Sequence, residues 1–223
     1  MGPSRPNPPT NDNTDIARST DRDAALLEAW RGGDEDAGIA LVRRYYPLVE
    51  LFFMNKVTTE VVDLVQQTFE ECLKSRDKIA DPALFRPYLF SIAYNVLRMR
   101  FRRHSRAPTL VELDEITAYE QAPGPSSVVA AHQEQRLLLE ALRRISLADQ
   151  VLLELFYWED MGIKEIGDIL GCPKNTVKSR LRAARGRLEQ TLRELEASPG
   201  VLKSTLTRLE DWASSIAKLR FQP

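Results

Sequence analysis

The stretch GIKEIGDILGCPKNTVKSRLRAARGRL, residues 162–188, carries most of the information about the architecture of this chain. Apolar residues recur at three- and four-residue spacings on both sides of Gly171, which predicts two short amphipathic helices joined by a tight turn. The first helix is expected to bury Ile163, Ile166 and Leu170. The second is expected to bury four residues at spacings of four, three and four, namely Val177, Leu181, Ala184 and Leu188. This pattern is typical of a helix-turn-helix.

The opposite face of the second helix is polar and basic. Its side chains are Lys174, Asn175, Thr176, Lys178, Ser179, Arg182 and Arg185. Lys and Arg can reach the O6 and N7 atoms of guanine, Asn and Ser can pair with other base edges, and a helix N-terminus favours phosphate. The pattern therefore predicts a helix that lies in the major groove of DNA. An ordinary helical hairpin with a basic outer face is the alternative.

The formal net charge of −1 hides a strongly uneven distribution along the chain. Residues 82–111 contain six arginines and no acid, and residues 171–188 contain six basic residues and no acid. Between these two runs, residues 112–135 contain five acids and no Lys or Arg. Either run alone could be a solvated helix face, but two such runs on predicted helices indicate an anion-binding surface, most simply for nucleic acid.

The composition argues against most enzymes and against membrane insertion. Only two cysteines and two histidines are present, too few for a disulfide framework and little for a zinc site or a histidine-based dyad. Phosphate-loop, nucleophile-elbow and dinucleotide motifs are missing as well, so we expect no cofactor and no metal. The mean hydropathy is −0.33, and no run approaches the roughly 18 apolar residues of a membrane helix. With no secretory signal recognised, a cytoplasmic location is expected.

Periodicity along the whole chain predicts an all-α fold. We expect two small helical domains joined by an acidic flexible linker, with the helix-turn-helix in the second domain and an amphipathic helix at the C-terminus. The proline-rich start cannot bury enough apolar area to offset its chain entropy, and the linker holds three prolines. The predicted segments are a disordered region 1–20, a helical domain 21–106, the linker 107–126, the helix-turn-helix domain 127–196 and a C-terminal extension 197–223.

Three motifs in the right order resemble a known family. The sequences DLVQQTF at 63–69 and YLFSIAYN at 88–95, followed by arginines over 98–106, resemble the core-binding and −10-reading helices of bacterial RNA polymerase sigma factors. TVKSRLRAAR at 176–185 resembles the −35-reading helix of the same family. The short two-domain plan is similar to the extracytoplasmic-function (ECF) group of the sigma-70 family. The resemblance covers residues 21–192.

The resemblance implies roles for individual residues. The positions that match the family's helix for the polymerase β′ clamp are Asp63, Gln66, Gln67 and Glu70. The −10 element, read as a melted strand, is matched by Lys78 in the loop 77–84 and by Tyr88, Asn95, Arg98, Arg102 and Arg103. The −35 element, read as a duplex, is matched by the basic helix face described above. The acidic segment 112–120 matches the part that threads the polymerase cleft.

Three departures from the family pattern stand out. Tyr88 stands where the family commonly has tryptophan, and its ring can either stack on a base or belong to the core. Ala183 occupies a position where many members have arginine, so one −35 contact is missing or has moved to Arg182 or Arg185. The third departure is the C-terminal extension.

The implied function is that of a sigma factor, a non-enzymatic subunit for transcription initiation and its regulation. Its implied partners are core RNA polymerase, through the β′ clamp and the β subunit, and promoter DNA, with an anti-sigma factor as a candidate. One alternative is a stand-alone helix-turn-helix regulator with an N-terminal sensor domain. A metal-dependent nuclease that uses Asp63 and Glu70 is another.

The C-terminal extension has an apolar stripe that a lone helix would not leave in water. The stripe within 201–219 consists of Leu202, Leu206, Leu209, Trp212, Ile216 and Leu219. The helix either completes the core of the second domain or bridges to the first domain and inhibits the protein in cis. Dimerisation or a separate partner is the remaining alternative.

Overall fold

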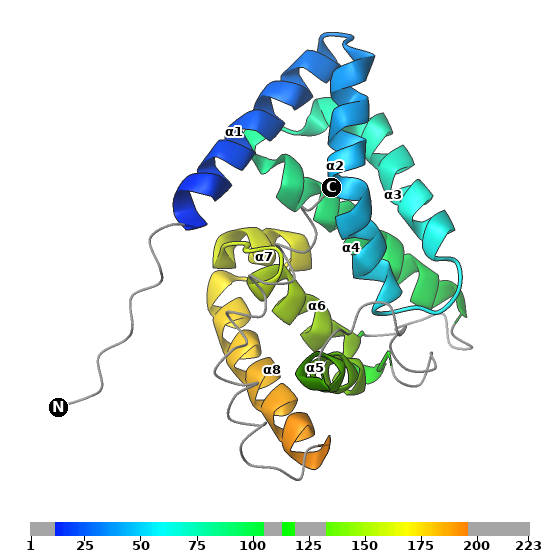
Figure 1. The fold of residues 1–223 in the computed structure, drawn as a ribbon, viewed down its shortest axis with the longest axis vertical. Coiled ribbons are helices and arrows are strands. Elements are labelled where there is room, and N and C mark those ends of the chain that lie inside the picture. The colour runs from blue at the N-terminus through cyan, green and yellow to red at the C-terminus, as the bar shows by residue number, and fades with distance from the viewer. Residues whose placement is uncertain (1–11, 105–112, 119–132, 196–223) are drawn as a thin grey trace, which may run out of the picture.

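The computed structural model describes residues 12–104, 113–118 and 133–195 (Figure 1). These ranges are helical and contain no strand, apart from one isolated bridge between Thr117 and Ser146. The predicted all-α fold is confirmed. The predicted helix of the C-terminal extension lies outside the described residues.

The N-terminal unit consists of four helices and two short 3-10 turns. The helices are α1 (Asp12–Arg31), α2 (Glu35–Met54), α3 (Val61–Ser75) and α4 (Phe85–His104), and the turns are η1 (Arg76–Lys78) and η2 (Pro82–Leu84). Helix α2 packs on α1 and α3, and α3 packs on α4. Apolar residues at helical spacings fill the space between them, including the fully buried Leu41, Val49 and Phe53 of α2. These residues form the part of the hydrophobic core that lies within this unit.

Local signals in the sequence set the starts of several helices. The turn at Gly32 and Gly33 leads into α2, where the Asp34 side chain accepts a hydrogen bond from Ala37 N at 3.1 Å. Asp81 accepts from Ala83 N at 3.0 Å and is followed by Pro82, so this Asp-Pro pair starts η2, which leads into α4. In the C-terminal unit, the Ser146 side chain accepts from Asp149 N at 3.2 Å and caps the start of α6.

Helix α1 begins earlier than predicted. The sequence suggested disorder over 1–20, but residues 12–20 form the first turns of α1, and residues 1–11 lie outside the described part. The prediction weighted the prolines of the first nine residues too heavily. From Thr10 to Arg31 the chain has neither proline nor glycine, so no residue of this stretch interrupts a helix.

The C-terminal unit consists of the turn η3 (Leu113–Glu115) and the helices α5 (Gln133–Arg144), α6 (Leu147–Tyr157), α7 (Ile163–Leu170) and α8 (Lys174–Leu195). Helix α8 packs on α5, α6 and α7. The prediction for the buried face of α8 is confirmed, because Val177, Leu181, Ala184 and Leu188 are all buried. Helix α6 is the most enclosed of the four, with Leu147, Val151 and Leu153 fully buried.

Part of the predicted flexible linker is packed. In the described segment 113–118, the side chains of Leu113 and Ala118 are buried, and the carbonyl of Ile116 accepts a hydrogen bond from Leu147 N at 2.7 Å. This segment therefore covers the start of α6. The rest of the predicted linker lies outside the described residues.

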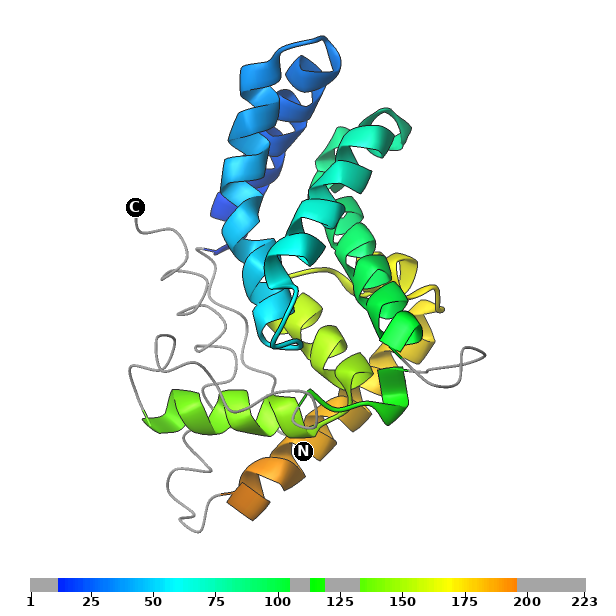
Figure 2. The same ribbon diagram turned by 90° about the vertical axis from the view of Figure 1, so that its right-hand side faces the viewer.

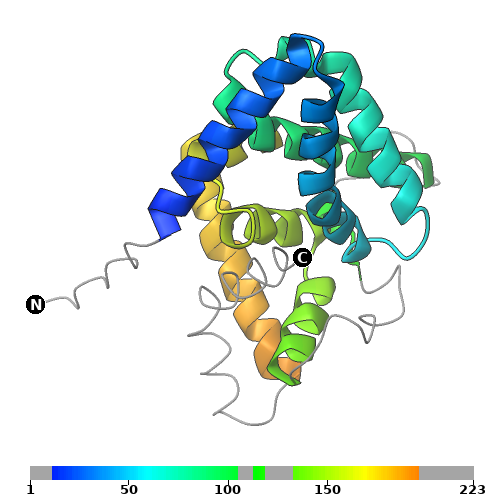
Figure 3. The same cartoon turned by 45° about the horizontal axis from the view of Figure 1, so that its top comes forward.

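The two units pack against each other. Helix α7 lies beside α4, as Figures 2 and 3 show from two directions. The buried apolar residues of both units form one connected cluster. The described chain is thus two helical units with a continuous interior.

Candidate nucleic-acid interface

The helix-turn-helix is formed by α7, a short turn and α8. Ile166 and Ile169 are buried, whereas Ile163 and Leu170 are half-buried, so the inward face of α7 is turned slightly from the predicted one. The side chain of Glu165 accepts a hydrogen bond from Gly162 N at 2.7 Å, which fixes the start of α7. Helix α8 starts after Pro173, whose carbonyl accepts from Val177 N at 3.1 Å.

Two glycines allow the sharp turn between these helices. Gly171 ends α7 with a φ of 66°, a left-handed conformation that side chains disfavour. At Gly167, a Cβ atom would meet the carbonyl oxygen of Cys172 at 2.7 Å. The close approach of the turn to α7 therefore requires glycine at Gly167, and this approach sets the direction in which α8 leaves.

The predicted −35 residues lie together on the outer surface of α8. Lys174, Asn175, Lys178, Ser179, Arg182 and Arg185 are exposed, and Thr176 is half-buried. Ser179 donates to the carbonyl of Thr176 at 3.0 Å, and the Arg185 guanidinium lies 5.8 Å from the centroid of the Tyr157 ring. Ala183 is also exposed, so the position where many family members have arginine is open to solvent.

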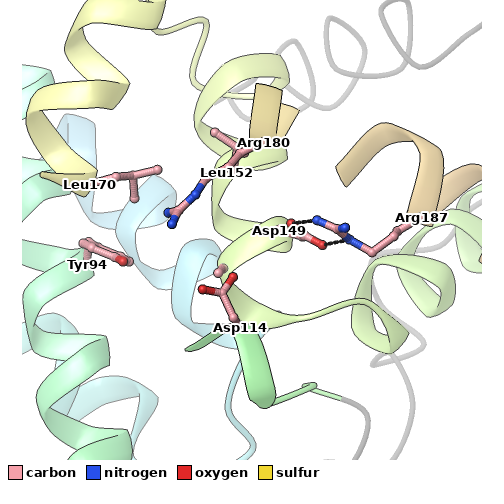
Figure 4. A pocket seen from close by; sticks show the side chains of 8 residues that line it. Tyr94, Asp114, Asp149, Leu152, Leu170, Arg180 and Arg187 are labelled. Atoms are coloured by element: carbon pink, nitrogen blue, oxygen red, sulfur yellow. Dashed lines mark hydrogen bonds and ion pairs between the residues drawn. The ribbon is translucent and has the colours of Figure 1, made fainter. Parts of the chain in front are cut away.

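Arg187 belongs to the same basic run but serves another purpose. Its guanidinium donates two hydrogen bonds to the carboxylate of Asp149 on α6, one of them 2.8 Å from Nη2 to Oδ1 (Figure 4). Asp149 is buried. The bidentate pair holds α8 against α6, and the bond to Asp149 raises the pKa of Arg187. Arg187 therefore positions α8.

The predicted −10 residues on α4 are also exposed, with one exception. Asn95, Arg98, Arg102 and Arg103 are exposed along the second half of α4. Tyr88 is half-buried, and its hydroxyl lies 3.4 Å from the carbonyl oxygen of Ser75. Lys78, in η1, is exposed in the loop that precedes α4. Tyr88, Asn95 and Arg102 are seven residues apart, so they share one face of α4.

Two other arginines of the α4 run are bound to acids. Arg100 Nε lies 3.0 Å from Glu60 Oε2, and Arg86 Nη2 lies 2.9 Å from Glu159 Oε2. Glu60 is the residue before α3 and has a φ of 67°, so its ion pair ties a strained helix start to α4. Some arginines of this run of six are therefore exposed, and others form ion pairs within the fold. Arg106 lies outside the described residues.

The predicted polymerase-binding residues lie on α3. Asp63, Gln66 and Glu70 are exposed, and Gln67 is half-buried. Gln66 Nε2 donates to Glu70 Oε1 at 2.8 Å. Nearby, the rings of Tyr46 on α2 and Phe69 on α3 stack with centroids 6.3 Å apart. The face is thus polar, with aromatic and apolar neighbours.

The contact between the two units includes residues that sequence reasoning missed. Lys56 is fully buried and pairs with Glu154 of α6, and Gln150 Nε2 donates to Asn55 O at 3.3 Å. A cavity of about 150 Å³ lies where Tyr94 of α4 meets Arg180 of α8. Figure 4 shows Arg180 pointing toward Tyr94, with Asp114 below them. The only sign in the sequence that Lys56 is buried is its position as a lone cation within an apolar stretch.

Among the described residues, no group of three or more His, Cys, Asp and Glu side chains could hold a metal ion. None of the helices in the described ranges is both long and apolar enough to cross a membrane.

Comparison with known proteins agrees with this geometry. The sequence profile "Sigma-70 region 2" matches residues 41–107, and "Sigma-70, region 4" matches residues 135–188. The ECF RNA polymerase sigma-E factor of Escherichia coli (strain K12) is 28% identical over 182 residues, which are 78% of this chain and 95% of that protein. That of Haemophilus influenzae is 24% identical over 78% of this chain and 96% of its own length.

Two solved structures share the fold. The sigma factor RpoE of Bartonella quintana, in complex with the anti-sigma factor NepR, matches with a TM-score of 0.56 and 21% identity. It covers 69% of this chain and 95% of its own. CnrH, in complex with the cytosolic domain of CnrY, matches with a TM-score of 0.56 and 23% identity over 78% of this chain and 98% of its own.

The fold and the exposed basic surfaces define an all-helical protein with a DNA-binding helix-turn-helix. The two matched profiles are consecutive regions of one protein type, lie in the expected order and together span just over half of the residues. The chain belongs to the sigma-70 family of RNA polymerase sigma factors and resembles its ECF members. Its function is therefore to direct RNA polymerase to promoters for transcription initiation.

Proposed function

We propose that three separate surfaces divide the work of this sigma factor. Helix α8 binds the −35 element as duplex, α4 binds the −10 element as melted strand, and α3 docks on the β′ clamp of core polymerase. The single observation that carries this proposal is the distribution of exposed basic side chains over two helices in different units. The acidic and amide residues lie on a third helix.

The −35 surface is suited to duplex DNA. Lys174, Lys178 and Arg182 project from the N-terminal half of α8, where the helix dipole also favours phosphate. Asn175 and Ser179 add short hydrogen-bonding groups for base edges. The bond between Arg187 and Asp149 keeps the helix in place, so that these side chains enter the groove together.

The −10 surface is suited to a single strand. Arg98, Arg102 and Arg103 can neutralise phosphates, and Asn95 can hydrogen-bond to a base or to the backbone. Tyr88 is half-buried and can stack a base on its open side. Extruding a base costs about a few kcal/mol, so a fixed aromatic platform would help to retain the melted state. Lys78 lies in the loop proposed to hold an extruded base.

Other partners and properties follow from the same assignment. The protein would act in the cytoplasm, where core polymerase and promoters are found, and would carry out no bond chemistry itself. The two structural neighbours are both complexes with a second protein, and NepR is an anti-sigma factor. An anti-sigma factor is therefore a candidate partner for this chain as well.

In vitro transcription with core polymerase on randomised promoters tests the proposal. We expect initiation from a subset of templates that share two short elements, and Lys178→Ala should weaken selection at the upstream element only. Transcription that ignores the template sequence, or fails to start with purified core polymerase, would contradict the assignment.

Binding to the isolated β′ clamp tests the α3 surface separately. Asp63→Ala and Gln67→Ala should each weaken binding several-fold while leaving the melting temperature unchanged, since neither side chain is buried. Glu71→Ala is the matched control, because Glu71 is exposed on the same helix and pairs with Lys74 at 2.8 Å. If all three variants bind equally well, another surface contacts the clamp.

A further inference from the structure

The loop between α3 and α4 is held from outside by an arginine of α1. Arg31 is the last residue of α1, and only 19% of its side chain is exposed. Its Nε and Nη2 atoms donate to the carbonyl oxygen of Arg76 at 3.2 and 2.8 Å, and Nη2 also donates to the carbonyl of Ile79. These two carbonyls stand on either side of Asp77 and Lys78 in the chain. One guanidinium therefore bonds both ends of η1.

The backbone of this turn depends on such outside donors. A helix leaves its last carbonyls without partners inside the helix. Arg76 is the residue that ends α3, and the bond from Ile79 N to Arg76 O is long, at 3.4 Å. The bonds from Arg31 are shorter, so they contribute more to the shape of the turn. Arginine suits this task because its planar fork presents donors in a fixed geometry, whereas the ammonium group of lysine is a point charge on a flexible stem.

The end of α1 is itself firmly packed, which makes it a rigid support for the loop. The Trp30 ring lies so close to α2 that a Cβ atom at Gly38 would meet Trp30 Nε1 at 2.4 Å. On the loop side, the guanidinium of Arg76 lies 5.0 Å from a Trp30 ring centroid, within the range of a cation–π contact. Helix α1 also packs on both η1 and η2. The position of the loop is therefore coupled to α1 and α2.

The loop presents polar and apolar side chains to solvent from this support. Ile79 and Phe85 are buried and anchor the loop, whereas Asp77, Lys78 and Leu84 are exposed. A loop that receives an extruded base binds it best when its shape exists beforehand, because ordering a flexible chain would consume part of the binding free energy. A fixed backbone is therefore a condition for selecting one base over another at this place.

We propose that Arg31 is a positioning residue for the loop 77–84, and that it sets how strictly the protein selects the extruded base of the −10 element. The inference rests on the proposed role of this loop. Arg31 acts through the backbone carbonyls of Arg76 and Ile79, and not through a contact of its own with DNA. Its effect is therefore confined to the base that the loop holds, and the surfaces on α8 and α3 are unaffected.

Arg31→Lys is the decisive change, because it keeps the positive charge and removes the planar fork. In the full-length protein, the backbone amides of residues 76–80 should exchange with deuterium about tenfold faster, as expected when hydrogen bonds to a charged group are lost. Arg22→Lys is the matched control, because Arg22 is exposed earlier on the same helix. Helix content and melting temperature show whether each variant is folded.

Arg76→Gln gives a second route to the same loop and keeps the Arg76 carbonyl. It removes the guanidinium from the Trp30 ring, and the ion pair that it breaks is with Asp77, whose side chain is 77% exposed. Exchange over residues 76–80 should rise in the same direction, by a smaller factor than in Arg31→Lys. This variant decides the case if Arg31→Lys does not fold.

Transcription with core polymerase on −10 elements randomised one position at a time measures base selection. Arg31→Lys should lower the preference at one position about threefold, since a wrong base at one position of a site typically costs about fivefold or more in affinity. Preferences at the other −10 positions and at the −35 element should stay as in the parent. On a template with an abasic site at the affected position, parent and variant should initiate equally well, because no base is left for the loop to hold.

The outcomes separate a positioning role from a general contribution to the fold. A loss of preference spread over all positions, or a defect that persists on the abasic template, would overturn the inference. Unchanged amide exchange in a folded Arg31→Lys protein would overturn it as well. A loosened loop with the parental base preference would remove the role of Arg31 alone. A parent protein that prefers no base in the −10 element would contradict the proposed function of the loop, and the inference with it.

Discussion

Helices α4 and α8 share one sequence feature, a run of basic residues without acids, but the basic side chains of the two runs have different roles in the fold. Each belongs to an acid-free run with six basic residues. In the α4 run, Arg86 and Arg100 bond to acids elsewhere in the fold, and Arg98, Arg102 and Arg103 stay exposed. In the α8 run, Arg187 bonds to Asp149, and the other five basic residues are exposed. A basic run thus mixes exposed residues, which are available for binding, with residues that hold the fold together.

Arg187→Ala should separate these two classes most clearly. It leaves the buried carboxylate of Asp149 without its two hydrogen bonds, so we expect unfolding free energy to fall by about 2 kcal/mol. Arg182→Ala, on the exposed face of the same helix, should change it by less than about 0.5 kcal/mol. Urea unfolding followed by circular dichroism measures both. Equal stabilities would mean that Arg187 is a surface residue like Arg182.

Lys178→Ala and Arg182→Ala should lower −35-dependent initiation by about 1.5 kcal/mol each, or roughly tenfold. If the side chain contacts a base, one promoter position should become less specific. If it contacts phosphate, all sequences should weaken alike. Arg193→Ala is the control, because it removes the same charge from the far end of α8, where Arg193 bonds Glu189. Parental activity in both test variants would place the reading surface elsewhere.

Asn95→Ala and Arg102→Ala should affect promoter opening more than duplex binding. We expect each to lower the rate of open-complex formation about fivefold, near 1 kcal/mol, because stacking and phosphate contacts form only on the melted strand. A promoter with a pre-melted bubble should restore part of this loss. Equal defects on closed and bubble templates would assign both residues to the fold. Arg100→Ala, which breaks a pair with Glu60, provides the structural comparison.

Ala183→Arg should produce the smallest change, and it should be a gain. Ala183 is exposed on α8, so an arginine there can reach DNA without disturbing the core. One added phosphate contact should steepen the dependence of log affinity on log salt by about 0.9. Titration of a −35 duplex at several salt concentrations measures this slope. An unchanged slope would show that this position points away from the backbone.

The predictable part of the molecule followed from local patterns. The buried face of α8 was predicted, because helical periodicity depends on residues within about four positions, and the cap at Ser146 is a contact of equally short range. The exposure of Asp63, Asn95 and Lys178 also follows from that periodicity, although their roles rest on resemblance. The start of α1 was missed because prolines nearby outweighed a helix-compatible stretch.

The less predictable part depends on contacts across long sequence separations. Glu60 and Arg100 are 40 residues apart, Arg86 and Glu159 are 73 apart, and Lys56 and Glu154 are 98 apart. No local pattern distinguishes Arg86 and Arg100 from the arginines that face solvent, and Lys56 differs only in being a lone cation within an apolar stretch. The packing of residues 113–118 on α6 could not be predicted either, because the acidic composition of the segment indicated a flexible linker.

By itself, the amino-acid sequence determined the helical architecture, the helix-turn-helix and the family. The helices follow from the short-range spacing of apolar residues, and the family follows from residue types at matched positions. Only the tertiary structure decided which charges remain available to DNA and how the two units meet. Coulombic and hydrogen-bond partners are chosen by the packing of distant helices, where a buried cation such as Lys56 must find an acid or stay in water.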